Sequence, residues 1–266
     1  MKAKLGQNFL QDESVLEFEA ESAGVSGKSV LEIGAGDGRL TKKLLAFGAG
    51  HITAVEFDPK LAKSLRAIPS FQRRVKVVEG DFLSFPDSSR FNSIVGNIPY
   101  YITSPILLKL ARMDFDLAVI CVQKEVALRM LAAPGSREYG RLSVFCQLSF
   151  KAKILMLVDR SAFSPAPKVD SCIISLRKTG FSLDSRTDKI MGALFSHKKK
   201  SVRNAVIDAR HELFGSCDKK KAADEAQKLK YAGRKVFTLE PSELVETAGQ
   251  LEPSAGSYGA GRLQEK

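Results

Sequence analysis

Residues 29–38 read Ser-Val-Leu-Glu-Ile-Gly-Ala-Gly-Asp-Gly, and this stretch decides how the first two-thirds of the chain is interpreted. Residues 29–33 are apolar apart from Ser29 and Glu32, which is typical of a buried strand. Three glycines follow at alternate positions, and a helix-like pattern begins just after them at Thr41. Glycine lets a backbone turn sharply and approach a ligand closely. The stretch therefore predicts a strand, a ligand-binding loop and a helix of an α/β fold.

The same alternation of short apolar runs and helix-like segments extends outward from this loop. Strands are expected at residues 29–33, 51–57, 75–78, 91–95, 117–122, 154–158 and 172–176. Helices are expected at residues 41–47, 59–67, 105–113 and 124–131. Such alternation implies right-handed crossovers and a mostly parallel seven-stranded sheet covered on both faces. The last two strands flank a tight turn at residues 163–167 and are expected to form an antiparallel pair at one edge.

The character of the sequence changes near residue 180, where strand patterns stop and basic, helix-like segments begin. Helices are expected at residues 188–195, 201–214, 219–230 and 241–249. Residues 253–266 are rich in Gly and Ser and are expected to form a disordered tail. We therefore divide the chain into an α/β domain at residues 1–179, a small all-helical domain at 180–252 and the tail at 253–266.

Composition favours a polyanionic partner. The 266 residues include 41 Lys and Arg against 30 Asp and Glu, which gives a formal net charge of +11. Basic surfaces bind nucleic acid because phosphate contacts release condensed counterions. The four cysteines are widely spaced and only three histidines are present, so neither a disulfide framework nor a metal site is expected. The longest apolar run, residues 117–122, is too short to cross a bilayer, and we expect a cytoplasmic protein without membrane attachment.

Acidic residues lie at the ends of the first three predicted strands. Glu32 precedes the glycines, Glu56 ends the second strand, and Asp81 follows the third. Ligands bind at the carboxyl ends of parallel strands. A dinucleotide site would need a glycine at the position of Arg39, whereas an acidic residue ahead of the glycines suits the cationic methionine end of S-adenosylmethionine. The alternative is that the glycines form only a tight turn.

Asn97-Ile98-Pro99-Tyr100 follows the fourth predicted strand, where an ordinary Asn/Pro turn is the alternative interpretation. The exocyclic amine of adenine is a poor nucleophile because its lone pair is delocalised into the ring. An Asn side-chain oxygen and the carbonyl next to a proline can accept hydrogen bonds from the amine and stabilise its developing positive charge. The Tyr100 ring can stack on a base. The loop therefore predicts methyl transfer to a planar amine.

Together with Gly-Gln-Asn-Phe-Leu at residues 6–10, this loop resembles the rRNA adenine N6-dimethyltransferases. The same resemblance extends over residues 4–250 and is carried further by residues 123–127, 139–143, 163–171 and 196–204. It implies a Rossmann-like methyltransferase fold with S-adenosyl-L-methionine as cofactor in residues 1–179 and an rRNA-binding role for residues 180–252. The glycine loop departs modestly from the family, which often has Gly-Pro-Gly where this chain has Gly-Ala-Gly.

The resemblance also implies residue roles. The cofactor would contact Asn8, Leu10, Glu32, Gly34, Gly36, Glu56, Asp81, Phe82 and Asn97. Catalysis would involve Asn97, Pro99, Tyr100 and Phe163, with Phe163 facing Tyr100 across a flipped adenine. A basic helix after Ser196 would bind RNA through Lys198, Lys199, Lys200 and Arg203, although a charge run is more often a solvated helix face. Phe163 is otherwise a packed turn aromatic, and Tyr101 is expected to pack as scaffold.

The family has two main branches. One dimethylates two adjacent adenosines near the 3′ end of small-subunit rRNA during ribosome biogenesis, and the other modifies a large-subunit adenosine and confers macrolide resistance. Residues 163–171 and the basic run favour the first branch, with a monomer acting on a pre-ribosomal particle. The large-subunit enzyme and a non-catalytic rRNA-binding assembly factor remain the alternatives.

Overall fold

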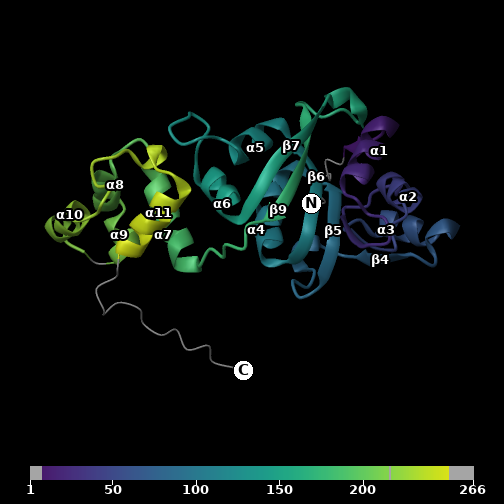
Figure 1. Ribbon diagram of the computed structural model, residues 1–266, viewed down its shortest axis with the longest axis horizontal. Coiled ribbons are helices and arrows are strands. Elements are labelled where there is room, and N and C mark those ends of the chain that lie inside the picture. Colours follow the sequence, from purple (N-terminus) through teal and green to yellow (C-terminus); the bar gives the residue numbers. More distant parts are fainter. Residues whose placement is uncertain (1–7, 216, 252–266) are drawn as a thin grey trace, which may run out of the picture. The chain divides into compact units, whose positions relative to one another are not determined.

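A seven-stranded sheet forms the centre of the first part of this computed structural model, which describes residues 8–215 and 217–251 (Figure 1). The strand order is β4-β3-β2-β5-β6-β9-β7. Its members are β2 (Ser29–Ile33), β3 (His51–Glu56), β4 (Val75–Glu79), β5 (Arg90–Asn97), β6 (Asp114–Gln123), β7 (Phe150–Val158) and β9 (Ser171–Lys178). The mostly parallel α/β sheet of seven strands is confirmed.

The antiparallel strand lies inside the sheet. β9 pairs antiparallel with both β6 and β7, whereas β2 to β6 pair with one another in parallel. β9 therefore lies between β6 and β7 in the sheet. The sequence predicts that the last two strands pair, but it does not reveal this order. All five parallel strands thus present their carboxyl ends at one edge, which is where ligands bind in such sheets.

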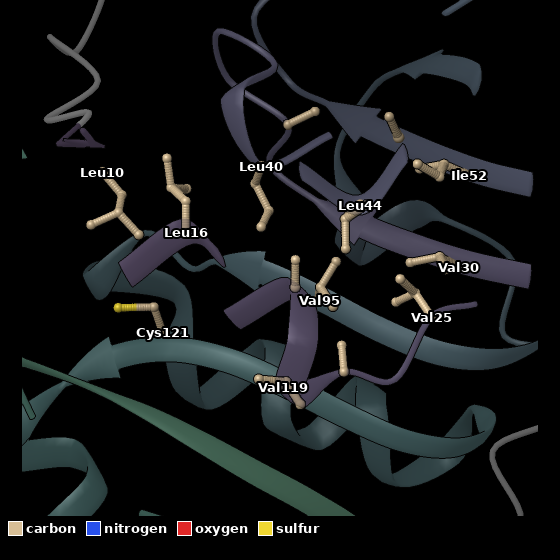
Figure 2. Packing of buried hydrophobic residues seen from close by; sticks show 14 of the residues in the cluster. Leu10, Leu16, Val25, Val30, Leu40, Leu44, Ile52, Val95, Val119 and Cys121 are labelled. Atoms are coloured by element: carbon tan, nitrogen blue, oxygen red, sulfur yellow. The ribbon is translucent and has the colours of Figure 1, made fainter. Parts of the chain in front are cut away.

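Helices cover both faces of this sheet. They are α1 (Glu13–Ser22), α2 (Arg39–Ala46), α3 (Pro59–Arg66), α4 (Thr103–Arg112) and α5 (Lys124–Met130). Figure 2 shows Leu16 of α1 and Leu40 and Leu44 of α2 packing with strand residues in one hydrophobic cluster. Leu31 and Ile94 alternate with the strand residues of that cluster and are also fully buried, as a parallel sheet covered on both sides requires.

N-cap aspartates and a glycine explain where the first three helices begin. Asp12 caps α1 by accepting hydrogen bonds from the backbone N–H groups of Ser14 and Val15. Asp58 caps α3 in the same way, and Pro59 occupies its first turn. Gly38 begins α2 with a φ of 81°, and a Cβ there would lie 2.8 Å from a methyl carbon of Leu65. Glycine at this position is therefore required by both backbone and packing.

Four elements, two helices and two short strands, are not predicted by the sequence pattern. Apolar and acidic residues alternate from Leu16 to Glu21, a period of two that is typical of a strand, so the sequence pattern does not indicate the helix α1. α6 (Arg141–Ser149) lacks a clear apolar stripe. β1 (Phe9–Leu10) and β8 (Phe163–Ser164) form a two-stranded antiparallel sheet whose strands are too short to show periodicity.

The chain divides into two compact units, and the second contains residues from two separate stretches. The first unit is Met1–Leu131 with Ser149–Ser182, and the second is Ala132–Leu148 with Leu183–Lys266. The division near residue 180 does not account for residues 132–148. The reason is packing, because Tyr139 is fully buried in the helical cluster and its hydroxyl donates a 2.8 Å hydrogen bond to the backbone oxygen of Leu239.

The second unit is helical among the residues that the structure describes. Besides α6 it contains α7 (Ser185–Ser196), α8 (Val202–Asp208), α9 (Arg210–Phe214), α10 (Lys219–Gln227) and α11 (Pro241–Gln250). The helix predicted at residues 201–214 is broken at Ala209 into α8 and α9, and the one predicted at 219–230 ends at Gln227. The predicted tail at 253–266 lies outside the described residues, as do Gly6 and Gln7 of the N-terminal motif.

Within residues 8–215 and 217–251, no helix is long and apolar enough to cross a membrane. The same residues contain no group of three His, Cys, Asp or Glu side chains that could hold a metal ion.

Candidate active site

A pocket of about 310 Å³ lies at the carboxyl ends of the parallel strands in the first unit. Every residue predicted to contact a cofactor lines it: Asn8, Leu10, Glu32, Gly34, Gly36, Glu56, Asp81, Phe82 and Asn97. Pro99 and Tyr100 of the predicted catalytic loop line it as well. The pocket thus brings together five segments that are far apart in the sequence.

The glycine loop is held in place by Glu56. One carboxylate oxygen of Glu56 accepts a 2.8 Å hydrogen bond from the backbone N–H of Gly36, and the other accepts one of 2.8 Å from Asp58. Gly34 and Gly36 have φ values of 72° and 58°, which L side chains rarely adopt. A Cβ on Gly36 would come within 3.2 Å of the Phe9 ring. The Glu56 carboxylate and the Phe9 ring therefore fix the shape of the glycine loop.

Glu32 is buried behind this loop. Its side chain is 1% exposed and accepts a 2.6 Å hydrogen bond from the Thr41 hydroxyl. Burial raises the pKa of Glu32 to about 8, against the lowering effect of that hydroxyl and with a further rise from Glu19 nearby. In the free protein this carboxyl is therefore largely protonated at neutral pH.

Glu19 of α1 is a third buried carboxyl at the pocket, beside those of Glu32 and Glu56, and the sequence did not single it out. It is fully buried, and neither of its carboxyl oxygens has a hydrogen-bond partner among the described residues. Burial raises the pKa of Glu19 to about 8, although the backbone N–H of Gly96 opposes that rise. A glutamate between apolar neighbours, Phe18 and Ala20, is the only hint of it that the sequence offers.

The catalytic loop begins at the last residue of β5. The Asn97 side chain donates a 3.1 Å hydrogen bond from Nδ2 to the backbone oxygen of Asn8, so its Oδ1 is left as an acceptor. The backbone N–H of Ile98 donates to the backbone oxygen of Cys121 at 3.1 Å, and the Ile98 side chain is buried. These contacts hold the loop to both the N-terminal segment and the neighbouring strand β6.

Two tyrosines follow at the pocket wall in a short 3-10 helix, Tyr100–Ile102. The hydroxyl of Tyr100 shares a 2.7 Å hydrogen bond with the Ser171 hydroxyl, and burial raises the pKa of Tyr100. Tyr101 is 67% exposed while lining the pocket, so the expectation that it packs as scaffold is wrong. Tyr101 comes directly after Tyr100, whose hydroxyl is bonded to β9, and the Tyr101 ring faces solvent.

Asp81 and Phe82 close the pocket on the side of β4. Asp81 accepts a 2.8 Å hydrogen bond from the backbone N–H of Leu83 and remains exposed. Phe82 is buried and stacks near Phe85, with ring centroids 6.4 Å apart. An exposed carboxylate beside a buried ring is a suitable site for one edge and one face of a purine.

Phe163 is not brought to the pocket. Its ring is 4% exposed and belongs to the hydrophobic cluster under the sheet. The reason is the pairing of β8 with β1, in which Phe163 lies opposite Leu10. The structure therefore shows the packed turn aromatic, and a stacking role for Phe163 would require its ring to leave the hydrophobic cluster.

The basic run in the second unit is a turn and not a helix. Residues 197–200 connect α7 and α8. Lys198 donates from Nζ to the backbone oxygens of Arg137 and Tyr139, at 3.1 and 2.8 Å, and Lys200 pairs with Asp208. Arg203 on α8 is half-buried, whereas Lys199 is exposed. The predicted helix is wrong because His197 ends α7 and Ser201 caps α8.

Solved structures with this fold identify the class of protein. A dimethyladenosine transferase from Plasmodium falciparum aligns with 90% of this chain and 95% of its own, with a TM-score of 0.77 and 27% identity. The 23S rRNA methyltransferase ErmE aligns with 92% of this chain and 99% of its own, with a TM-score of 0.64 and 29% identity. The fold and the pocket make this chain a Rossmann-like methyltransferase, a class that implies S-adenosylmethionine as methyl donor.

Sequence comparisons identify the family within that class. The profile described as "Ribosomal RNA adenine dimethylase" matches residues 1–236. The chain is 37% identical over 265 residues to a "Probable ribosomal RNA small subunit methyltransferase A" from Methanopyrus kandleri, covering 96% of this chain and 94% of that protein. A protein of the same name from Thermococcus onnurineus is 38% identical over 251 residues, covering 93% and 91%. The chain belongs to the ribosomal RNA adenine dimethylase family.

Proposed function

We propose that this protein transfers methyl groups from S-adenosyl-L-methionine to N6 of two adjacent adenosines near the 3′ end of small-subunit rRNA. The observation that carries the proposal is the position of Asn97, Pro99 and Tyr100 on the same pocket as the acidic glycine loop. The small-subunit choice is supported by the names of relatives 37% and 38% identical to this chain.

The residues of the pocket fit the proposed cofactor, which supplies an electrophilic methyl group when bound. Each oxygen of Glu56 accepts one backbone hydrogen bond and has a second lone pair that can accept from a ribose hydroxyl. The exposed carboxylate of Asp81 can accept from the adenine amine, with the Phe82 ring beside it. Gly34 and Gly36 leave room for the methionine part next to Glu32, and Asn8, Leu10 and Asn97 line the same pocket.

Asn97 and the loop after it would hold the target amine. Since Nδ2 of Asn97 is used by Asn8, Oδ1 can accept one amine hydrogen, and the backbone carbonyl of Ile98 can accept the other. Two acceptors favour a tetrahedral nitrogen and stabilise positive charge as it develops. No strong base is required because the proton can leave after transfer. Pro99 fixes the backbone between the two acceptors and the aromatic ring that follows.

Tyr100 would stack on the adenine and hold it in line with the methyl group. Its hydroxyl bond to Ser171 fixes the ring, which reduces the freedom lost when the base is bound. Exposed Tyr101 extends the aromatic surface toward solvent. Phe163 would join the stack only if its ring left the hydrophobic cluster.

The second unit would dock the rRNA, with the protein acting as a cytoplasmic monomer on a pre-ribosomal particle. The net charge of +11 supports a polyanionic partner. Among the predicted RNA contacts, exposed Lys199 is the most available, whereas Lys198, Lys200 and Arg203 are at least partly engaged within their own unit. Such contacts position the RNA and do not read its sequence.

The large-subunit enzyme is the second candidate, and the similarity to ErmE favours it. Small and large ribosomal subunits lacking these modifications should be incubated with labelled cofactor and the methylated adenines mapped. We expect two adjacent dimethyladenosines in the small subunit only. Label confined to large subunits would select the alternative, and cofactor binding without label in either subunit would select an assembly factor.

A further inference from the structure

Glu19 stands out because nothing in the fold requires an acid there. The other buried residues of α1 include Val15, Leu16 and Ala20, so the buried face of the helix is otherwise apolar. A carboxyl in such a place normally has hydrogen-bond partners. Glu19 is fully buried, lines the pocket, and has no hydrogen-bond partner for either oxygen among the described residues. A ligand in the pocket would supply the missing partner.

The groups around Glu19 point to a cation. Glu32 of β2 and Cys121 of β6 are near enough to Glu19 that its negative charge raises the pKa of each. The backbone N–H of Gly96 in β5 lies near enough to lower the pKa of Glu19, but it makes no hydrogen bond of normal geometry with either carboxyl oxygen. Two carboxyls that share a buried cavity cannot both ionise without an opposite charge between them.

The rest of the pocket is acidic too. Its other ionisable side chains are Asp37, Arg39, Glu56, Asp81, Tyr100 and Tyr101. Arg39 is the one basic side chain among the described residues that line the pocket, and it pairs with Asp37 at 3.0 Å and Glu13 at 3.6 Å. A positive charge beside an ionised Glu19 would therefore have to come from the ligand.

We propose that Glu19 is the counter-charge for the cationic part of S-adenosylmethionine, and that it loses its proton when this cofactor binds. The inference rests on the proposed function and names a cofactor contact within it. The cofactor carries a sulfonium as well as an ammonium and a carboxylate, which gives one net positive charge. Its product, S-adenosylhomocysteine, has lost the sulfonium and is neutral overall. Glu19 therefore stays protonated beside the product, and the pocket holds the methyl donor more tightly.

The pH dependence follows from the direction of the pKa change. Burial places the pKa of free Glu19 near 8, and a bound cation lowers it. At neutral pH each bound S-adenosylmethionine then releases a proton, so its affinity rises with pH until the pKa of the free carboxyl is reached. Binding of S-adenosylhomocysteine is nearly independent of pH over the same range.

Isothermal titration calorimetry near pH 7, in buffers of different ionisation enthalpy, counts the protons released. Wild-type protein should release close to one proton on binding S-adenosylmethionine and almost none with S-adenosylhomocysteine. Glu19→Gln keeps the shape of the protonated side chain and should abolish the release. It should also lower the affinity for S-adenosylmethionine about tenfold, which corresponds to a pKa change of about one unit, and leave the affinity for S-adenosylhomocysteine unchanged. Glu21→Gln, at an exposed position of α1, is the matched control and should behave as wild type.

The outcomes separate this inference from the proposed function. If both compounds bind and Glu19→Gln releases the same proton as wild type, the proton comes from elsewhere and the inference is wrong. If neither compound binds any variant, the proposed cofactor itself is wrong. Should the variant not fold, wild-type protein still decides: sinefungin, which carries an amine in place of the sulfonium, should release a proton as S-adenosylmethionine does, and equal release with neutral S-adenosylhomocysteine overturns the inference.

Discussion

The pocket of the first unit and the basic run at residues 197–200 of the second unit were both predicted from short sequence motifs to be binding sites. They differ in whether their side chains are available to a ligand. At the pocket, side chains from five separate segments face one cavity because parallel strands end at one edge of the sheet. In the turn, Lys198 and Lys200 bind groups of their own unit. The pocket is thus predictable from backbone topology. Whether the side chains of a basic run are free to bind RNA depends on their neighbours in the fold, which the spacing of residues in the sequence does not reveal.

The largest expected effect tests the pocket side of this comparison. Asn97→Ala removes the proposed acceptor for the target amine, so methyl transfer should fall by about 10²–10³-fold. Cofactor affinity should change far less, because the glycine loop and Glu56 remain. Single-turnover transfer and equilibrium binding measure the two effects separately.

Asn92→Ala is the matched control, because Asn92 lies at the other end of β5 and also makes side-chain hydrogen bonds, to Ser29 and Asp116. It should lose some stability and keep its transfer rate at full cofactor occupancy. Near-normal transfer by Asn97→Ala would remove Asn97 from the catalytic role.

Glu56→Gln tests the proposed cofactor contact at the end of β3. The change weakens acceptance from the N–H groups of Gly36 and Asp58 and from the proposed ribose contact, so cofactor affinity should fall by about 1.5–3 kcal/mol. Glu79→Gln is the control, since Glu79 lies beside Glu56 in the register of β3 and β4 but points to an exposed pair with Arg66. Equal losses in the two variants would show that Glu56 does not contact the cofactor.

Two of the three buried carboxyls at the pocket, Glu19 and Glu32, predict how stability depends on pH. Burial raises the pKa of Glu19 and of Glu32 from 4.5 to about 8, so the folded form keeps protons that the unfolded chain loses. Their contribution is therefore favourable below pH 4.5 and is lost as pH rises toward 8, by about 1.4 kcal/mol per pH unit for each group.

Glu19→Gln should reduce that slope by about 1.4 kcal/mol per pH unit, as measured by chemical denaturation between pH 5 and 8. Glu21→Gln should leave it unchanged, since Glu21 is exposed. A slope that is the same in wild type and Glu19→Gln would mean that Glu19 ionises freely in the folded protein.

The smallest effect concerns the basic turn. Lys199→Ala should leave the free energy of unfolding unchanged and reduce the slope of log affinity for rRNA against log salt by about 0.7–0.9, the loss of one phosphate contact. Lys198→Ala should instead destabilise the second unit by about 1.5–3 kcal/mol, because Lys198 binds two backbone oxygens there. Reversed behaviour of the two lysines would mean that the docking surface is built from Lys198.

The sequence predicts most of the sheet and most of the pocket lining for a physical reason. Buried strands such as residues 29–33 need continuous apolar runs, and the glycine loop needs positive φ values, so both leave a pattern. Features that depend on pairing across the fold leave none. Phe163 is buried where β8 pairs with β1, Tyr101 is exposed next to Tyr100, which is bonded to Ser171, and Glu19 reaches the pocket from a helix whose acidic alternation looks like a strand.

The small sheet of β1 and β8 has a consequence for biosynthesis. Asn8 and Phe9 form one wall of the pocket, and their strand is held by Phe163 and Ser164, which leave the ribosome more than half a chain later. A nascent chain that ends before these residues has its glycine loop and Asn97 but lacks the partner that fixes the wall. The strand that holds this wall of the pocket is therefore synthesised long after the residues of the wall itself.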